Sequence, residues 1–394
     1  MKRWLHSLFI RAATLIAGVL AVSGVAAGGT PYVVANDDQS TGVFSGDGVS
    51  FYAVAGNGLL TLQKQVAMGG LGIGGGFFGA NRIGVLDSGK RGCVYASEAA
   101  TGDIVGIVVS TLTVGGKATG SDTDAGTSNG IGLAMNDQYL YASFTDSNTI
   151  GTFSVQPGCD LAFLNDTAVA GLQGGTINGM AVHGNLLIAT YTDGSIESFD
   201  ITGGTPLSNG DKQYSTATRN SQDATYPNSI DITSDGHFAI FGDTSTSIVV
   251  EVSDISSGKL SKTVAYKYTA SISSSNVMLS PDETLLYVAN TQGDSVTALF
   301  FDKTTGKLSR GCTSNPLRGV STNWSYLAGL ALISQTGAGG GVYVAEFGST
   351  SGIAMVRLAV SGATCSLHEA TASPFAEPNS PGLLSIGNFP PRSF

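Results

Sequence analysis

The stretch SPDETLLYVAN at residues 280–290, followed by SVTALFF at 295–301, decides the fold of this 394-residue chain. Each stretch carries a short apolar or aromatic run bounded by proline, glycine or polar residues, which is the pattern of β-strands joined by turns. Two further strands are predicted beside them, one over Val277–Ser280 and one after the turn at residues 305–307. The stretch therefore predicts a sheet of four strands.

The same unit recurs along the chain. Its apolar runs are centred on Tyr32, Tyr95, Tyr141, Ile188, Ala239, Tyr287 and Tyr343. The intervals between these residues are 63, 46, 47, 51, 48 and 56. About 50 residues accommodate the four strands and turns of one propeller blade. The sequence thus predicts an all-β chain, a single seven-bladed β-propeller over residues 28–394 with four antiparallel strands in each blade.

The two ends of the repeat array indicate how the ring closes. The first unit begins at Tyr32 with no innermost strand before it, whereas PGLLSIG at residues 381–387 resembles the innermost strands at 329–332 and 130–133. We therefore expect the C-terminal strand to complete the first blade, which leaves no unpaired sheet edge. The alternative is a disordered, proline-rich tail.

Composition excludes other classes of protein. Only 12% of the residues are charged, 55 are glycine, and the formal net charge is −10. Coiled coils and other charge-laced helices do not fit this composition. The lysines and arginines are scattered, so no basic patch is available to neutralise the phosphates of a nucleic acid.

Residues 1–27 have the pattern of a secretory signal peptide. Lys2, Arg3 and Arg11 precede an apolar stretch, and small residues at 25–27 suit a signal peptidase. The alternative is a retained membrane anchor, although the uncharged run is short for a span of about 20 residues. Removal of the signal changes the net charge from −10 to about −13. We expect a monomer, secreted or periplasmic, with no membrane span once the signal is removed.

The four cysteines fit an oxidising compartment. Three pairings are open to them. We favour Cys93 with Cys159 and Cys312 with Cys365, because each of these pairs joins adjacent blades on one face of the ring. The alternative is four free, buried thiols.

The unit at residues 280–299, followed by DKTTGKL at 302–308, resembles the lactonase-like seven-bladed β-propellers and their relatives with Tyr-Val-Thr-Asn-type repeats. The resemblance is close in this repeat and looser in the other six. Family members include 6-phosphogluconolactonases and carboxymuconate cyclases, which open or close lactone rings without a cofactor, and secreted propellers of no known activity. The resemblance implies the fold first, because fold does not settle function.

The chain departs from catalytic members where it enters the innermost strands. The resemblance implies a histidine motif there, with arginine and glutamate nearby. These entrances instead read ANRI, SNGI, INGM and PNSI at residues 80–83, 128–131, 177–180 and 227–230. The missing histidine motif weighs against an enzyme.

Polar residues at these entrances are candidates for ligand binding. Asn81, Asn129, Asn178 and Asn228 share one aligned position in four successive blades, so their amides could ring the mouth of the axial channel. The alternative is that asparagine suits each turn locally. Asp231 falls inside an apolar innermost strand, where it points into the channel or is simply hydrated.

Three charged residues are candidates for catalysis. Glu98 and Glu346 each follow an anchor tyrosine by three residues, in the two blades that flank the first, and Arg82 enters the same region. One glutamate could act as general base while Arg82 polarises a lactone carbonyl. The alternative is that all three are solvated loop charges. We assign no metal and no cofactor.

The sequence therefore favours an exported platform that binds a small polar ligand or an extracellular protein. The alternative is a cofactor-free lactone hydrolase or cyclase that uses Glu98, Glu346 and Arg82 at the axial channel mouth.

Overall fold

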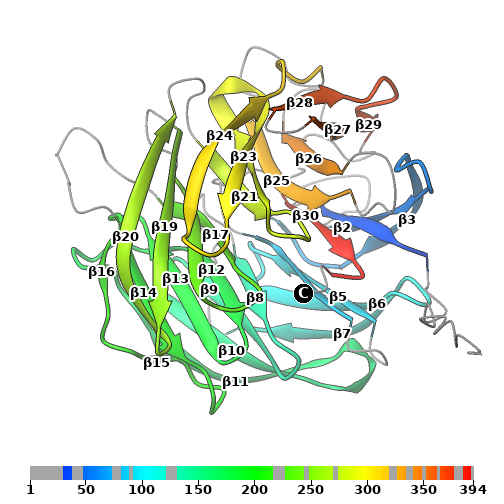
Figure 1. Cartoon of the computed structure of the whole chain (residues 1–394). Helices are drawn as coiled ribbons and strands as arrows, with labels where there is room; N and C mark the ends of the chain where they lie inside the picture. The colour runs from blue at the N-terminus through cyan, green and yellow to red at the C-terminus, as the bar shows by residue number, and fades with distance from the viewer. Residues whose placement is uncertain are drawn as a thin grey trace, which may run out of the picture.

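Seven antiparallel sheets surround a central axis (Figure 1), and their innermost strands contact one another in cyclic order. This arrangement confirms the predicted seven-bladed β-propeller. The computed structural model describes residues 30–37, 48–72, 81–87, 92–120, 131–215, 227–243, 248–268, 274–318, 326–333, 340–347, 352–361, 364–376 and 385–391. The predicted signal at residues 1–27 lies outside the described residues. Among the described residues, no helix has the length and apolar character needed to cross a membrane.

The strands of each blade run in order from the axis outward. Blade 1 contains β30 (Ser385–Phe389), β1 (Tyr32–Asn36), β2 (Gly48–Val54) and β3 (Leu60–Ala67). Blade 2 contains β4 (Ile83–Leu86), β5 (Cys93–Glu98), β6 (Asp103–Val108) and β7 (Thr113–Thr119). Blade 3 contains β8 (Gly132–Met135), β9 (Tyr139–Phe144), β10 (Thr149–Val155) and β11 (Leu161–Ala168), with the 3₁₀ turn η1 (Pro157–Cys159) between the last two. Blade 4 contains β12 (Ile177–His183), β13 (Leu186–Tyr191) and β14 (Ser195–Asp200), with β15 (Leu207–Ser208) and β16 (Gln213–Tyr214) both paired to β14.

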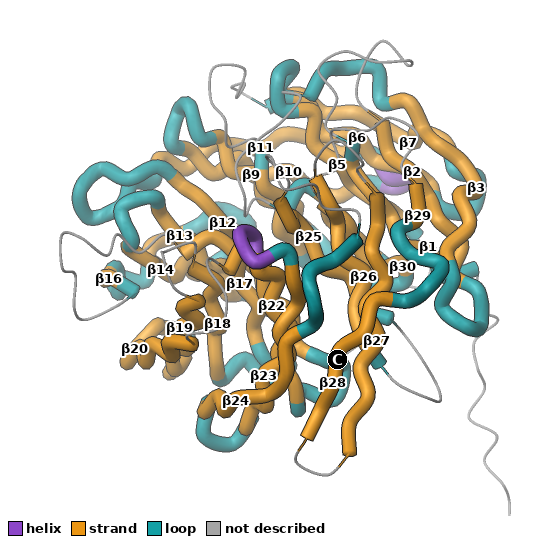
Figure 2. Tube along the Cα trace, turned by 90° about the horizontal axis from the view of Figure 1, so that it is seen from above, coloured by secondary structure: helices purple, strands orange, loops and turns teal. Residues whose placement is uncertain are grey.

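The remaining three blades follow the same order. Blade 5 contains β17 (Pro227–Ile232), β18 (Phe238–Asp243), β19 (Ile248–Ser256) and β20 (Lys259–Tyr268). Blade 6 contains β21 (Ser274–Leu279), β22 (Leu285–Asn290), β23 (Ser295–Asp302) and β24 (Lys307–Thr313), with the 3₁₀ turn η2 (Thr291–Gly293) after β22. Blade 7 contains β25 (Tyr326–Leu332), β26 (Gly341–Phe347), β27 (Gly352–Ser361) and β28 (Thr364–Glu369), with β29 (Phe375–Ala376) also paired to β27. In Figure 2 strands make up most of the described chain, with loops and turns between them.

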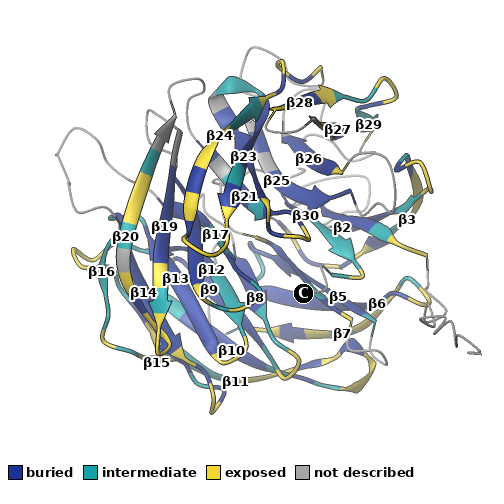
Figure 3. Cartoon of the chain, in the orientation of Figure 1, coloured by how far each residue is buried: buried dark blue, intermediate teal, exposed yellow. Residues whose placement is uncertain are grey.

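The core of the molecule lies between the blades (Figure 3). In β22, Tyr287 and Ala289 pack against blade 7, whereas Leu286 and Val288 pack against blade 5. Successive side chains of a strand point to opposite faces of its sheet, so a second strand that is apolar throughout serves two interfaces at once. This double burial explains why the second strand carries the repeat signal in the sequence.

The C-terminal strand closes the ring. β30 pairs antiparallel with β1 over five positions, from Tyr32 with Phe389 to Asn36 with Ser385. The predicted closure is confirmed, although the strand spans Ser385–Phe389 and not residues 381–387, of which 381–384 lie outside the described residues. Asn388 also accepts a hydrogen bond from the backbone N–H of Leu332 at 2.7 Å and donates one to the Leu332 carbonyl at 2.8 Å, which ties β30 to blade 7.

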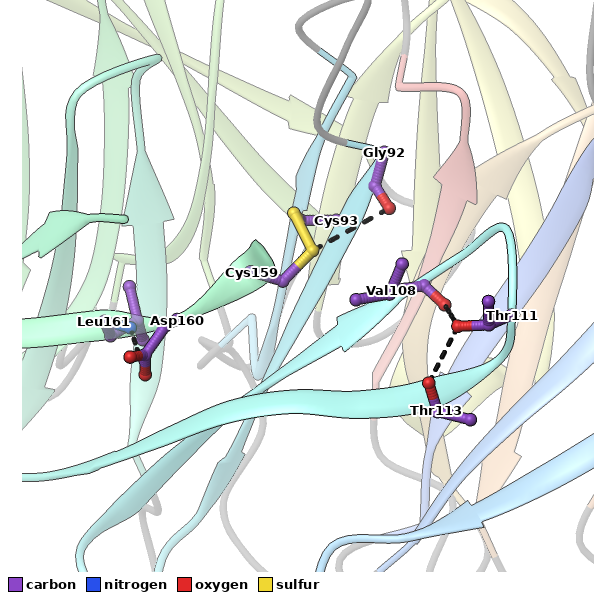
Figure 4. Close-up of a disulfide and its surroundings, with 8 residues drawn as sticks. All are labelled: Gly92, Cys93, Val108, Thr111, Thr113, Cys159, Asp160 and Leu161. Carbon is purple, nitrogen blue, oxygen red and sulfur yellow. Dashed lines mark hydrogen bonds between the residues drawn. A yellow bond between two sulfur atoms is a disulfide. The ribbon is translucent and has the colours of Figure 1, made fainter. Parts of the chain in front are cut away.

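Two disulfides link neighbouring blades. Cys93 is bonded to Cys159 between blades 2 and 3 (Figure 4), and Cys312 to Cys365 between blades 6 and 7. Their Cα atoms are 5.5 and 5.6 Å apart. These are the pairs that adjacency of the blades favoured over the two other pairings.

Loss of the first disulfide should destabilise the ring strongly. It spans 66 residues, so the chain-entropy model gives a loss of about 4 kcal/mol in the free energy of unfolding. We expect the double variant Cys93→Ser, Cys159→Ser to lose about 2–5 kcal/mol in denaturant titrations. The matched variant Cys312→Ser, Cys365→Ser, whose disulfide spans 53 residues, should lose a similar amount. A loss of less than about 1 kcal/mol in both variants would show that the blades do not depend on these crosslinks.

Candidate functional site

A cavity of about 340 Å³ lies on the propeller axis, and all seven innermost strands contribute to its wall. Much of the wall is apolar and includes Met135, Met180 and Met278. The polar side chains in the wall are those of Asn81, His183, Ser229, Asp231, Asn276, Ser385 and Asn388. A cavity of this size, in which apolar side chains alternate with convergent polar groups, is typical of small-molecule sites.

Asp231 supplies the acidic side chain of the cavity wall. It lies within β17, and its Oδ1 accepts a hydrogen bond from the backbone N–H of Ile232 at 2.9 Å. Its Oδ2 accepts a second from the backbone N–H of Leu279, in blade 6, at 2.7 Å. These bonds fix the carboxylate at the junction of two innermost strands. The structure therefore places Asp231 on the channel, among polar groups, although its neighbours in sequence are apolar.

Asn81 and Ser385 form a polar rim where the chain enters the innermost strands of blades 1 and 2. Ser385 Oγ donates to Asn81 Oδ1 at 2.9 Å and accepts from the backbone N–H of Arg82 at 3.2 Å. Asn36, the last residue of β1, donates through Nδ2 to the Ser97 carbonyl at 3.0 Å. The first two blades are thus joined at this rim by polar side chains.

The other predicted amide ligands do not gather at this rim. Asn178 and Asn228 are buried, and Asn178 Nδ2 donates to the Pro227 carbonyl at 3.0 Å between blades 4 and 5. Asn129 lies outside the described residues. Asn81 is therefore the one member of the predicted set that the described structure places in the cavity wall.

Glu98 is fully buried and belongs to an ion-pair cluster. Its Oε1 accepts a hydrogen bond from the backbone N–H of Gly70 at 2.5 Å, and its Oε2 lies 2.9 Å from Lys117 Nζ. Lys117 Nζ also lies 2.6 Å from Asp103 Oδ2. Burial raises the pKa of the Glu98 carboxyl, and the hydrogen bond and charge of Lys117 oppose that rise. Burial lowers the pKa of Lys117, but its bonds to Asp103 and Glu98 outweigh burial and raise it overall.

Glu346 and Arg82 are also buried, each with 1% of its surface exposed. Strand alternation turns the two glutamates toward different interfaces. Glu98 follows Val94 and Ala96, which pack against blade 1, whereas Glu346 follows Val342 and Val344, which pack against blade 6. The cavity wall contains none of the three predicted catalytic side chains among its described residues.

Three buried carboxylates, Asp37, Asp243 and Glu251, were not predicted from the sequence. Asp37 and Asp243 occupy the position of Glu98 in their own blades. Asp37 was missed because the repeat alignment used Tyr32 as the equivalent of Tyr95. In the structure Val34 packs against blade 2 as Tyr95 packs against blade 3, so Val34 is the equivalent residue and Asp37 follows it by three positions. Burial and the nearby Asp243 carboxylate raise the pKa of Glu251 to about 8, while the Ser215 hydroxyl acts in the opposite direction. A charged residue within an apolar strand was the available signal for Glu251.

Comparison with known proteins places the chain in a family. A model of the lactonase family of seven-bladed β-propellers matches residues 94–380, well over half of the chain. No curated protein sequence matches the chain. A protein from Desulfotomaculum acetoxidans of unknown function is 14% identical, with a TM-score of 0.60 over 90% of this chain and 98% of its own.

Two other solved structures share the fold but carry different names. The periplasmic gluconolactonase PpgL of Pseudomonas aeruginosa is 14% identical, with a TM-score of 0.53 over 71% of this chain and 81% of its own. The hydrazine synthase of Kuenenia stuttgartiensis is 16% identical, with a TM-score of 0.51 over 72% and 78%. At these identities the structures show the fold alone, whereas the family model matches the sequence itself. The chain therefore belongs to the lactonase family of seven-bladed β-propellers.

Proposed function

We propose that this protein hydrolyses an uncharged, sugar-derived lactone outside the cytoplasm, and that the axial cavity holds the substrate. The observation that carries the proposal is the cavity itself, because a polar-lined volume of about 340 Å³ at the axis suits a hydroxylated six-membered ring. Membership of the lactonase family supports hydrolysis over the binding platform that the sequence alone favoured. The two disulfides support an oxidising compartment.

Lactone hydrolysis needs a base for water and donors for the developing oxyanion. Water attacks the ring carbonyl, and the base takes a proton from it. The bond from the acyl carbon to the ring oxygen then breaks as the base returns that proton to the ring oxygen, and the hydroxy acid that results ionises and releases its own proton to solvent. Asp231 is the base in this scheme, since its carboxylate is held in the wall by two backbone N–H groups and has acceptor capacity beyond them. The amide nitrogens of Asn81 and Asn276 supply donors in the same wall.

The charge of the cavity selects among lactones. The wall contains the Asp231 carboxylate and, within the described residues, no lysine or arginine. The mature chain as a whole is acidic, at about −13 if the three leader cations are removed from the total of −10. A phosphate group would therefore be repelled with nothing to compensate it, and about 1.4 kcal/mol of repulsion is a tenfold loss in affinity.

We expect the mature protein to turn over gluconolactone with a kcat/KM at least about tenfold higher than for 6-phosphogluconolactone. Proton release measured in weakly buffered solution gives both rates after subtraction of spontaneous hydrolysis. Aliphatic lactones of the same ring size test whether the hydroxyl groups are recognised. A preference for the phosphorylated substrate would contradict the charge argument, and no turnover across the panel would return the protein to a binding role.

The same assay distinguishes the cavity from the buried carboxylates predicted from sequence. Asp231→Asn should remove turnover, whereas Glu98→Gln and Glu346→Gln should change it much less, because their side chains lie outside the cavity wall. If instead a glutamate variant loses turnover and Asp231→Asn keeps it, the site lies where that glutamate is buried. For Glu98 this is the interface of blades 1 and 2, and for Glu346 it is the interface of blades 6 and 7.

A further inference from the structure

The interface between blades 4 and 5 contains two carboxylates that the proposed reaction does not use. Asp243 ends β18 and pairs with Val249 of β19, while Glu251 of β19 pairs with Phe241 of β18. Asp243 and Glu251 are therefore diagonal neighbours on one face of the sheet, a spacing at which long side chains meet. Phe241 packs against Ile188 and Ile196 of blade 4, so this face looks toward blade 4.

Blade 4 presents uncharged oxygens to this pair. Ser215, just after β16, is fully buried and anchored by a hydrogen bond from its backbone N–H to the Gly194 carbonyl at 3.0 Å. Its hydroxyl lies close enough to Glu251 to lower the pKa of that carboxyl. Thr190, Asn178 and Asn228 are buried polar residues of the same two blades. Ser215 is thus the uncharged oxygen of blade 4 that the structure places beside Glu251.

Glu251 lacks a compensating partner within the described part of the chain. It has no exposed surface, and neither of its carboxylate oxygens makes a well-formed hydrogen bond; the Ser215 hydroxyl is near enough to lower the Glu251 pKa but is itself without a well-formed hydrogen bond. The lysine nearest to Ser215 in the sequence, Lys212, is committed elsewhere, with its Nζ 3.1 Å from Glu197 Oε2 and 2.6 Å from the Ala170 carbonyl. A buried carboxylate without hydrogen bonds or a counter-charge costs several kcal/mol, so it takes up a proton or a cation.

We propose that Asp243, Glu251 and the Ser215 hydroxyl bind a calcium ion between blades 4 and 5. Two carboxylates and a hydroxyl form a hard-oxygen ligand set of the kind Ca²⁺ prefers, and backbone carbonyls or waters complete its coordination. The absence of a well-formed hydrogen bond between Glu251 and any described neighbour favours an ion between the oxygens over one shared proton. No three acidic, histidine or cysteine side chains gather among the described residues, so only two ligands carry charge. We therefore expect a Kd of about 10⁻⁴–10⁻³ M, the range of extracellular calcium modules.

The ion would complete a set of links around the ring. Disulfides join blades 2 and 3 and blades 6 and 7, and β30 joins blade 1 to its neighbours on both sides. The interface of blades 4 and 5 lies across the ring from β30, and both disulfides of the chain lie elsewhere. A calcium ion there would hold the two blades together. This role is independent of the proposed hydrolysis.

The test is calcium binding by the mature protein after treatment with EDTA. Isothermal titration should show one site with a Kd in the stated range, and about 10 mM Ca²⁺ should raise Tm by about 2 °C or more. Glu251→Gln should abolish both the heat of binding and the rise in Tm. Ser215→Ala, a milder change that keeps both carboxylates, should weaken binding severalfold.

A matched control comes from Glu283, a buried glutamate whose carboxylate is satisfied. Its Oε1 accepts a hydrogen bond from the Ser234 backbone N–H at 2.5 Å, and its Oε2 one from Ser234 Oγ at 3.0 Å. Glu283→Gln should leave the calcium-dependent rise in Tm unchanged. The proposal is overturned if wild-type protein binds no calcium, or if Glu251→Gln or Ser215→Ala binds it as tightly as wild type does.

Discussion

A chain that ends at Leu384 should fail to fold cooperatively. It lacks β30, so β1 loses its partner over five positions and the innermost layer of blade 1 is gone. The contacts of Ile386 with the core between blades 1 and 7, and the bonds from Asn388 to Leu332, are lost with it. We expect this loss to exceed the net stability of a domain, which is about 5–15 kcal/mol. Circular dichroism and thermal unfolding of the purified chain measure the effect.

The control for this truncation ends at Pro391. That chain keeps β30 complete and removes only residues 392–394, so its unfolding should match that of the full chain. The shortened chain could instead unfold cooperatively near the wild-type Tm. That result would show that six complete blades and one incomplete blade suffice for a stable fold, and that β30 is not needed to close the ring.

Asp231→Asn should reduce kcat/KM for the hydrolysed lactone by at least about 10²-fold. The substitution keeps the size of the side chain but removes the group that accepts a proton from water. One of its two backbone bonds survives, because the asparagine oxygen still accepts from Ile232 or Leu279. We therefore expect the folded structure to persist with a small loss of stability, of about 1 kcal/mol. Proton-release rates and thermal unfolding of the same preparation separate the two effects.

Asp193 offers a matched control for this variant. Its carboxylate also accepts hydrogen bonds from backbone N–H groups, from Gln173 at 2.7 Å and Ser195 at 3.0 Å, but it lies outside the cavity wall. Asp193→Asn should therefore lose comparable stability with little change in turnover. His183 lies in the cavity wall and is the other side chain there that can take a proton. Loss of turnover in His183→Gln with Asp231→Asn active would keep the cavity and reassign the base.

The fold could be predicted from the sequence because the second strand of each blade carries the recurring apolar run. Tyr287 and Val288 are both buried, one against each neighbouring blade, so their apolar character survives in every repeat. The disulfide pairing follows from the blade count alone, since each favoured pair joins adjacent blades. The observed bounds of β30 lie further toward the C-terminus than the predicted bounds. Glycine and proline before a strand locate its first residue only approximately, whereas the pairing with β1 defines it.

The candidate site was harder to predict because it depends on which way side chains face. Glu98 and Glu346 occupy the same position in the repeat, yet that position faces the preceding blade, so the two carboxylates enter different interfaces. Asp231 enters the cavity because its strand is innermost, a fact that spacing indicated. Its bond to Leu279 in the next blade joins residues 48 positions apart, and no local pattern contains that contact.

The decisive measurement for hydrolysis in the axial cavity is proton release from gluconolactone by the mature protein, with the Asp231→Asn variant assayed beside it. We expect hydrolysis above the spontaneous rate for wild type and a loss of at least about 10²-fold for the variant. A wild-type rate equal to the spontaneous rate, or a variant as active as wild type while Glu98→Gln or Glu346→Gln is inactive, would contradict the assignment of Asp231 and the cavity.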